Sequence, residues 1–596
     1  MFKTLLKNVG EFKRASILTP VYTSLEVLVS AFIPYVTASI IDKGINGGAD
    51  GRGDMTNVCL YGGLMLALAF LSLFFGIKAG TNSAYASTGF AYNLRDAMYR
   101  NIQTFSFSNI DRFSSSGLIT RMTTDVSNLQ NAFQQILRAS VRAPLNLVFS
   151  IFMCVLINWK MSIIFIVAML ILGCALFFII TKTVKLFSQV FVKYDDLNKS
   201  VQENVQAIRV VKAFVREDYE NKKFKKAAEA LYKLFVKTES LQALNHPIMN
   251  LVVYGCIIAL SWFGAHFIVG GELTTGELTS MFAYVMTILT SLMMLTMIFV
   301  TITMSAANGK RVCQVLDEKA DITSPANAVT IVKDGSVEFQ DVSFSYNQAI
   351  ADEDGEVKKS VTRPALQHVS FRVEPGETIG VIGGTGCGKS TLASMVSRLY
   401  DVGQGTVKVG GVDVRQYDVT ALRNDVSMIL QNNILFSGTI LDNLRWGKAD
   451  ATLEECQQAC QLAQASEFIE QMPEQYDTVI EQSGANVSGG QKQRLCIARA
   501  LLKKPKVLIL DDSTNACDTE TEAKILDAFN NKVPDITKII ISQRIQSVRH
   551  ANRIIVMDSG QVNGIGTHEQ LLKSNKIYQE INKLQMEASG DFDPKQ

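Results

Sequence analysis

The chain has 596 residues, of which 47% are hydrophobic and 19% are charged, and its formal net charge is +2. Because one hydrophobic core rarely supports such a length, we expect at least two domains. The charged fraction is low for a water-soluble protein of this size, and the small net charge argues against a nucleic-acid partner. Apolar residues concentrate before about Lys310, which predicts a membrane region followed by a soluble one.

The first residues, MFKTLLKNVGEFKR, contain no apolar core followed by a small-residue cleavage site. This pattern is typical of a basic amphipathic helix on the inner membrane surface and not of a cleaved signal.

Six apolar stretches follow, each near the 20 or so residues that cross a bilayer. They occupy 17–41, 58–80, 138–158, 161–183, 248–270 and 277–303. The two long connecting segments, near 81–137 and 184–247, are richer in Lys and Arg than the short ones, which places them and both termini in the cytoplasm. The sequence therefore predicts a multi-pass protein of the cell membrane.

Three features of these stretches stand out. Glu26 lies in the first stretch, where an ionisable side chain either meets a cationic substrate or pairs with a neighbouring helix. Lys78, near the cytoplasmic end of the second stretch, is better explained by snorkelling to the interface. The sixth stretch is rich in Met and aromatic residues, which suit a promiscuous pocket and equally suit helix packing or lipid contact. These residues are Met281, Phe282, Tyr284, Met286, Met293, Met294, Met297 and Phe299.

After Asn308 the pattern changes to short Val- and Ile-rich strands and amphipathic helices, which is typical of an α/β domain. We predict a membrane domain with long cytoplasmic helical loops at 1–310, a linker at 311–334, a nucleotide-binding domain at 335–578 and a polar tail at 579–596. The acidic stretch 347–364 is interpreted as a solvated surface loop.

A phosphate-binding motif, G-x-x-x-x-G-K-S, occupies Gly383 to Ser390. A β-type run precedes it and a helical pattern follows, which is the context that such a loop requires. Its small residues allow backbone N–H groups to converge on phosphate at a helix N-terminus. We expect Lys389 to reach the β- and γ-phosphates of a bound nucleotide and Ser390 to bind Mg²⁺. The other predicted nucleotide contacts here are Gly384, Thr385, Gly386, Cys387, Gly388 and Thr391.

A second nucleotide-site element is the apolar run Val507 to Leu510, which leads into Asp511 and Asp512. The run predicts a buried parallel strand that delivers acidic side chains to the edge where α/β sheets bind ligands. Asp511 is expected to hold Mg²⁺, directly or through water. The position of Asp512 is where a nucleotide hydrolase needs a base or a group that positions the attacking water.

Between these elements lies VSGGQKQR, from Val487 to Arg494. With this segment the chain resembles half of an ATP-binding cassette (ABC) exporter over nearly its whole length, because VSGGQ matches the family signature. The resemblance implies that Tyr346 stacks on adenine and that Gln431 is the Q-loop glutamine, which also contacts Mg²⁺. It further matches NACD at 515–518 to the D-loop and GTHEQLL to a tail motif, and GLITRMTTD and ENVQAIRVVKAF resemble two intracellular-loop patterns.

In that family two cassettes pack head to tail, and each ATP contacts the phosphate loop of one subunit and the signature of the other. The resemblance therefore assigns Ser488, Gly489, Gly490 and Gln491 to an ATP that is held by a second ABC half-transporter. It implies a six-span α-helical membrane domain joined to an α/β P-loop NTPase domain, in which ATP drives export of a hydrophobic or amphipathic substrate through the lipid bilayer.

Two positions depart from the family pattern. Asp512 stands where the family has a catalytic Glu, which shortens the reach by about 1.5 Å, and a misplacement of about 1 Å can cost about 100-fold in rate. Gln543, in Ser542-Gln543-Arg544, replaces the switch His of an A-H-R segment. Glutamine donates hydrogen bonds but lacks the proton chemistry of imidazole. The two catalytic positions therefore predict an ATP site that hydrolyses slowly.

The intact signature beside this weakened site favours an asymmetric heterodimer, similar to bacterial heterodimeric multidrug exporters, whose other chain carries the Glu and the His. Two alternatives remain open: a homodimer with two slow sites, and a nucleotide-gated regulator or sensor that pumps nothing. An importer is disfavoured because its membrane helices usually belong to a separate chain, and the apolar spans exclude a soluble DNA-repair cassette.

Overall fold

The computed structural model describes residues 1–47, 53–351, 357–513 and 517–589. They form two compact units. Unit 1 comprises Met1–Thr104 and Ser114–Glu318, and unit 2 comprises Phe105–Phe113 and the chain from Lys319 onward. The domain boundaries that we expect from the sequence remain predictions. The structure adds that the short segment Phe105–Phe113, from within the first long connecting segment, belongs to unit 2.

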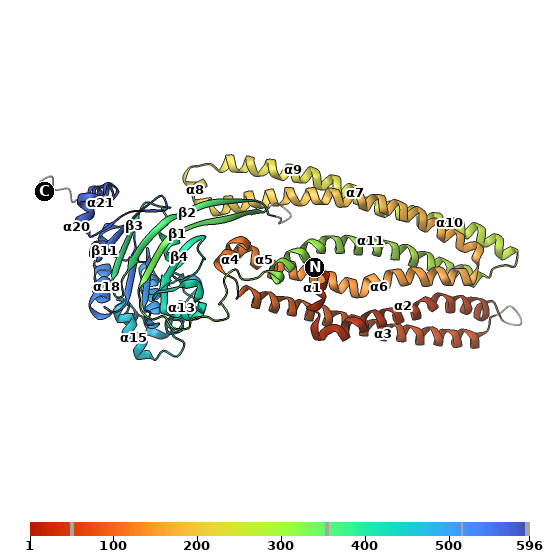
Figure 1. The fold of residues 1–596 in the computed structure, drawn as a ribbon. Coiled ribbons are helices and arrows are strands. Elements are labelled where there is room, and N and C mark those ends of the chain that lie inside the picture. Colours follow the sequence, from red (N-terminus) through yellow and green to blue (C-terminus); the bar gives the residue numbers. More distant parts are fainter. Residues whose placement is uncertain (48–52, 352–356, 514–516, 590–596) are drawn as a thin grey trace. The chain divides into compact units, whose positions relative to one another are not determined.

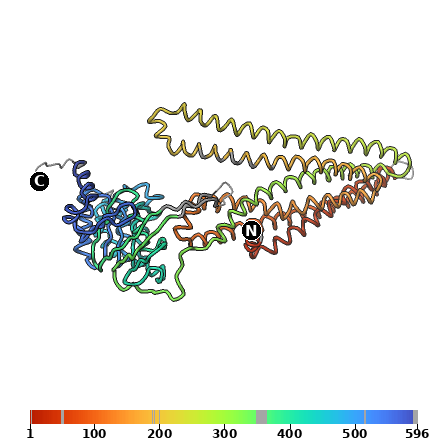
Figure 2. Tube along the Cα trace, turned by 45° about the horizontal axis from the view of Figure 1, so that its top comes forward, coloured from red at the N-terminus to blue at the C-terminus, as the bar shows by residue number. Residues whose placement is uncertain are grey.

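Unit 1 is built of helices (Figure 1 and Figure 2). Within the described part of the chain, six helical stretches are long and apolar enough to cross a membrane, as predicted. They are Gly10–Ile45, Met55–Ile102, Ser115–Ile157, Trp159–Phe187, Glu217–Val269 and Thr275–Asp317.

Several of these helices run far beyond the thickness of a bilayer. Helices α3 and α7 have 48 residues each, which corresponds to about 70 Å of helix against a hydrocarbon core of about 30 Å. The helices of unit 1 are α1 (Phe2–Lys7), α2 (Lys13–Ser39), α3 (Met55–Ile102), α5 (Ser115–Thr120), α6 (Val126–Ile157), α7 (Trp159–Gln206), α8 (Ile208–Ala213), α9 (Glu217–Ala243), α10 (Asn245–Val269) and α11 (Thr275–Asp317).

Two groups of helices can be followed in unit 1. Helices α2, α3, α6 and α11 contact one another, and α7 lies beside α9 and also contacts α10 (Figure 1). A buried apolar cluster joins α6, α7, α10 and α11 and includes Leu172, Leu260, Met281 and Tyr284. The Tyr284 hydroxyl donates to the carbonyl of Ala31 at 2.7 Å, which fastens α11 to α2.

Unit 2 contains a sheet in which six described strands follow the order β12-β11-β3-β10-β9-β6. Strand β12 is antiparallel to β11, and the other neighbours are parallel. The central strands are buried along their whole length, which accounts for their near-continuous apolar sequences. The strands are β3 (Thr378–Gly383), β6 (Val426–Ile429), β9 (Val507–Asp511), β10 (Thr537–Ile541), β11 (Arg553–Asp558) and β12 (Gln561–Gly566).

Helices and two apolar clusters accompany this sheet. The helices of unit 2 are α4 (Phe107–Phe113), α12 (Lys389–Val396), α13 (Val419–Asp425), α14 (Ile440–Arg445), α15 (Leu453–Leu462), α16 (Ser466–Glu470), α17 (Gly489–Leu502), α18 (Thr519–Lys532), α19 (Ile545–Val548), α20 (His568–Ser574) and α21 (Lys576–Ser589).

A second sheet of unit 2 has the order β2-β1-β4-β5, and it overturns one expectation. Its strands are β1 (Val337–Ala351), β2 (Val357–Val373), β4 (Gln404–Val409) and β5 (Val412–Asp413). The prediction of a surface loop at 347–364 is wrong, because β1 and β2 continue to pair from Asn347 opposite Thr362 to Ala351 opposite Val357. Backbone pairing tolerates the charged composition, and the β-branched residues Val357, Val361 and Thr362 favour extended chain.

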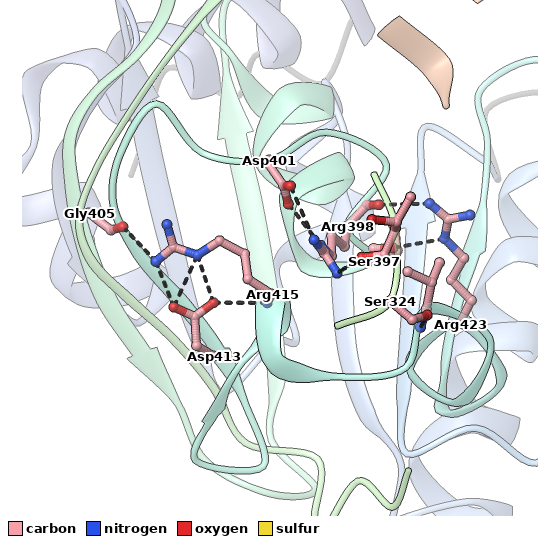
Figure 3. A network of polar contacts seen from close by, with 10 residues as sticks. Ser324, Ser397, Arg398, Asp401, Gly405, Asp413, Arg415 and Arg423 are labelled. Atoms are coloured by element: carbon pink, nitrogen blue, oxygen red, sulfur yellow. Dashed lines mark hydrogen bonds and ion pairs between the residues drawn. The ribbon is translucent and has the colours of Figure 1, made fainter. Parts of the chain in front are cut away.

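Polar contacts brace the chain just before β4 (Figure 3). Arg398 is buried at a φ of +49°, and its guanidinium donates to both carboxylate oxygens of Asp401 at 2.8 and 3.2 Å. Arg423 in turn donates to the Arg398 carbonyl at 2.7 Å. These bonds hold Tyr400, which lies directly before Asp401, in a defined position.

Candidate functional site

The predicted phosphate loop joins β3 to α12 and wraps around its own lysine. The Lys389 ammonium donates to the carbonyls of Gly383 and Gly384, each at 2.9 Å. Gly386 and Gly388 have φ of +82° and +97°, which side chains rarely adopt. A Cβ at Gly384 or Gly386 would meet nothing within 4 Å, so this side of the loop is open. The loop therefore presents small residues and a lysine to a space that a phosphate chain fits.

The sheet register brings the predicted Mg²⁺ carboxylate to this loop. In β10, Ile541 pairs with Val381 of β3 on one side and with Asp511 of β9 on the other. The Ser390 hydroxyl donates to the Asp511 carboxylate at 3.0 Å. Burial raises the pKa of Asp511, and the charge of Asp512 raises it further. A hydroxyl and a carboxylate are hard oxygen ligands that suit Mg²⁺, whose charge would offset the burial of the acid.

The two residues that depart from the family pattern contact each other. Asp512 is buried directly after β9 at a φ of +48°, and its backbone N–H donates to the Ile541 carbonyl at 2.9 Å. Gln543 follows the end of β10, and its side-chain amide donates to the Asp512 carboxylate at 3.2 Å. The fold thus places both departures at one point, beside Asp511.

Tyr346, the predicted adenine contact, lies close to the helix that follows the phosphate loop. Its hydroxyl is 3.1 Å from that of Thr391, and burial raises the pKa of Tyr346. The ring meets Tyr400 edge to face, with centroids 5.3 Å apart. The structure therefore brings Tyr346 and Thr391 together.

The sequence pattern does not indicate three residues that lie near Tyr346, namely Phe107, Asp111 and Tyr400. The Tyr400 hydroxyl donates to Asp111 of α4 at 2.5 Å, and the rings of Phe107 and Tyr400 lie 6.1 Å apart. Within unit 2, α4 thus reaches the side chain that packs on Tyr346. No local sequence pattern indicates this contact, because Asp111 and Tyr400 are 289 positions apart in the chain.

The signature residues lie at the start of α17. Ser488 caps this helix in a capping box with Gln491, through bonds of 2.9 and 3.3 Å, and Ser488 and Gly489 are exposed. Among the described residues, no hydrogen bond joins the signature to the phosphate loop. Gln431 follows β6 and is also exposed.

The predicted D-loop is only partly described. Asn515 and Ala516 lie outside the described residues. Asp518 caps α18 by accepting from the N–H of Thr521 at 2.8 Å. The tail-motif residue His568 contacts the hydroxyl of Tyr578 through its Nδ1 at 2.7 Å.

In unit 1 the structure supplies a partner for Glu26. Its carboxylate is buried and lies 3.3 Å from the guanidinium of Arg142 on α6, so α2 and α6 carry an ion pair. Lys78 is exposed, and its ammonium lies 5.9 Å from the ring centre of Phe74. Of the residues predicted in the Met-rich stretch, Met281 and Tyr284 are buried. Its exposed members are Met286, Met297 and Phe299.

Comparisons with known proteins agree with this architecture. Residues 17–293 match the family model described as the ABC transporter transmembrane region, and residues 366–515 match the family model described as ABC transporter. An uncharacterized ABC transporter ATP-binding protein of Bacillus subtilis, YfiB, is 35% identical over 95% of each chain. The chain belongs to the ABC transporter family. An ATP-dependent lipid A-core flippase of Desulfotalea psychrophila is 31% identical over 83% of this chain and 84% of its own.

A solved structure extends the likeness to three dimensions. The structure of a bacterial Atm1-family ABC exporter with ATP bound superposes with a TM-score of 0.77 at 25% identity, covering 96% of this chain and 98% of that one. The predicted fold class is confirmed: an ABC membrane domain of long apolar helices is fused to a P-loop ABC ATPase domain. This ABC transporter is a multi-pass, ATP-driven half-transporter of the exporter type.

Proposed function

We propose that this chain is the degenerate-site subunit of a heterodimeric ABC exporter. It binds ATP through the phosphate loop, with Mg²⁺ held by Ser390, Gln431 and Asp511, and it hydrolyses this ATP slowly. Its signature at 487–491 completes a competent site on a different chain, which supplies the catalytic Glu and the switch His. Both termini and the extensions of the long helices beyond the bilayer lie in the cytoplasm. These helix extensions transmit the conformational change on ATP binding to the membrane-spanning segments.

The observation that carries this proposal is the bond between Gln543 and Asp512. A catalytic base needs a free carboxylate lone pair aimed at the attacking water. Here the carboxylate is one methylene shorter than Glu, so it stops short of the place where a Glu would hold the water, and the amide that contacts it has no proton to pass on. The phosphate loop and the Ser390–Asp511 pair keep the groups that bind nucleotide. Binding is therefore retained while hydrolysis is slowed.

Two exposed apolar features support a second chain. In unit 2 the lining of a cavity of about 530 Å³ includes the exposed residues Leu430, Phe436 and Trp446, and the ring centroids of the last two lie 4.2 Å apart. In unit 1, Phe214 and Val215 directly after α8 are among the most exposed large apolar residues. Exposed apolar surface of this kind is typical of protein interfaces. We propose that a cytoplasmic loop of the partner's membrane domain covers the cavity and that the partner's ATPase domain covers α8.

The substrate is proposed to be hydrophobic or amphipathic. Met286, Met297 and Phe299 of α11 present an adaptable apolar surface in unit 1. The likeness to lipid A-core flippases supports a lipid-like amphiphile as one candidate class.

The test uses vesicles that contain this chain with the half-transporter that co-purifies with it. Asp512→Asn should change the ATPase rate by roughly twofold or less, while Glu→Gln at the partner's catalytic position should abolish ATP turnover and export. Loss of all ATPase activity in Asp512→Asn would overturn the asymmetric assignment. Brisk ATPase activity and export by this chain alone would show a homodimer, and ATP-driven cycling without export of any substrate would show a regulator.

A further inference from the structure

We propose that Gln585, on the last helix α21, is a positioning residue of the nucleotide site that fixes the backbone carrying Gln543. Its side-chain amide donates to the Gln543 carbonyl at 2.6 Å. The oxygen of the same amide accepts the backbone N–H of Ile545 at 2.9 Å. One side chain thus bridges the turn between β10 and α19 on both sides of Arg544.

The position of Gln585 on its helix indicates a dedicated role. Tyr578, Ile581 and Gln585 are spaced i, i+3 and i+7, so they share the face of α21 that packs on the protein. Tyr578 is 0% exposed and Ile581 packs against the buried cluster of unit 2. The apolar Leu584 beside Gln585 is instead 61% exposed. A glutamine at an inward position next to an outward leucine breaks the amphipathic pattern, which is expected where function overrides packing.

The helix that carries Gln585 is itself held firmly. The Tyr578 hydroxyl contacts His568 Nδ1 at 2.7 Å, and the Tyr578 N–H donates to the Asn575 side chain at 3.0 Å. These bonds connect α21 to α20 at the buried end of its inward face. Gln585 therefore holds the turn from a helix that is itself fixed, and its two hydrogen bonds form a clamp on the turn.

The consequence concerns the γ-phosphate. The turn holds Gln543, whose side chain points to Asp512 beside the phosphate loop. Because Gln585 holds the backbone carbonyl of Gln543, Gln543 can reach bound ATP only by rotating its side chain. Gln585 therefore sets how far the side-chain amide of Gln543 extends toward the γ-phosphate. This inference takes from the proposed function that ATP binds at the phosphate loop, and it adds that the Gln543 amide then turns from Asp512 to the γ-phosphate. ADP lacks that group, so the clamp should matter for ATP and not for ADP.

The experiment measures Mg²⁺-ATP and Mg²⁺-ADP affinity of the purified full-length chain by calorimetry. Gln585→Leu removes both bonds, and we expect ATP to bind about three- to tenfold more weakly with ADP affinity unchanged. Gln585→Glu keeps the acceptor for Ile545 but loses the donor to Gln543, and should weaken ATP binding as well. The matched control is Gln579→Leu on the same helix, which removes only a bond to the Leu572 carbonyl at 2.7 Å and should alter neither affinity.

A double variant separates positioning from a general effect on folding. In a Gln543→Ala background, Gln585→Leu should cause no further loss of ATP affinity, because the residue that it positions is gone. Additive losses, or equal losses for ATP and ADP, would overturn the proposal. If Gln543→Ala weakens ATP but Gln585→Leu does not, the positioning role fails while the proposed function stands. If Gln543→Ala leaves ATP affinity unchanged, the γ-phosphate contact itself is wrong and the clamp has no role.

The unmodified chain offers an independent readout, because coupling between two sites is reciprocal. Amide hydrogen exchange across 576–589 should be slower with ATP than with ADP. Identical exchange with the two nucleotides would overturn the proposal without any variant.

Discussion

In unit 1 the Arg311 guanidinium donates to both carboxylate oxygens of Asp125, at 2.8 and 2.6 Å. Asp125 ends a π-helical turn, Arg121–Asp125, that leads into α6, and Arg311 lies near the end of α11. The Asp125 side chain is 2% exposed. This bidentate ion pair therefore joins the start of α6 to the end of α11, with the Asp125 carboxylate shielded from solvent.

Removing the charge of Asp125 should destabilise unit 1. We expect Asp125→Asn to lower the free energy of unfolding by about 1–3 kcal/mol, because the guanidinium loses its ionised acceptor. Thermal unfolding in detergent measures the change. Asp96→Asn is the matched control, since the Asp96–Arg100 pair is exposed, at 45% and 79% for the two side chains, and such pairs contribute about 0–1 kcal/mol. An equal shift in both variants would contradict the assigned role.

The ion pair between Glu26 and Arg142 should behave as a structural unit. Each single change, Glu26→Leu or Arg142→Met, leaves one charge without its partner and should lower the melting temperature of the purified chain. The double variant should recover part of that loss, because neither charge remains. If the two single losses simply add in the double variant, the residues do not depend on each other.

Gly276 should be intolerant of a side chain. Its backbone N–H donates to Asp42 at 2.9 Å, and Asp42 also accepts from the Thr274 hydroxyl at 2.6 Å. A Cβ at Gly276 would overlap the Ala38 carbonyl and lie 2.6 Å from the Asp42 carboxylate. We expect Gly276→Ala to cost about 1–3 kcal/mol of stability. Gly62→Ala, where a Cβ would meet nothing within 4 Å, should cost far less in the same thermal unfolding assay.

Acidification should loosen α21. Burial, and next the charge of Arg549, lower the pKa of His568, which contacts Tyr578. The folded state therefore favours the neutral ring, so its stability is complete above the unfolded pKa of about 6.5 and falls as the pH drops through that value. Amide exchange across 576–589 should be faster at pH 5.5 than at 7.5, after correction for the intrinsic rate. His568→Gln cannot titrate at this position and should flatten the difference, and an unchanged difference would contradict this assignment.

The motifs of the ATP site could be predicted because each is a local pattern. Gly383 to Ser390 combines a strand, a glycine-rich turn and a helix in adjacent residues, and Asp511 ends an apolar run. The membrane spans depend only on local hydropathy. The expectation of a loop at 347–364 is wrong because a charged composition does not prevent strand pairing, which the β-branched residues of this stretch favour.

The sequence alone established that Asp512 and Gln543 differ from the family pattern, because the type of residue at a motif position can be read without a structure. Tertiary structure decided that these two side chains contact each other and that Arg142 pairs with Glu26. It also decided that α4 contacts Tyr400 and that Gln585 contacts the turn after β10. Such contacts join residues that lie tens to hundreds of positions apart. Packing of strands and helices selects them, and a linear pattern of residue types carries no record of which surfaces meet.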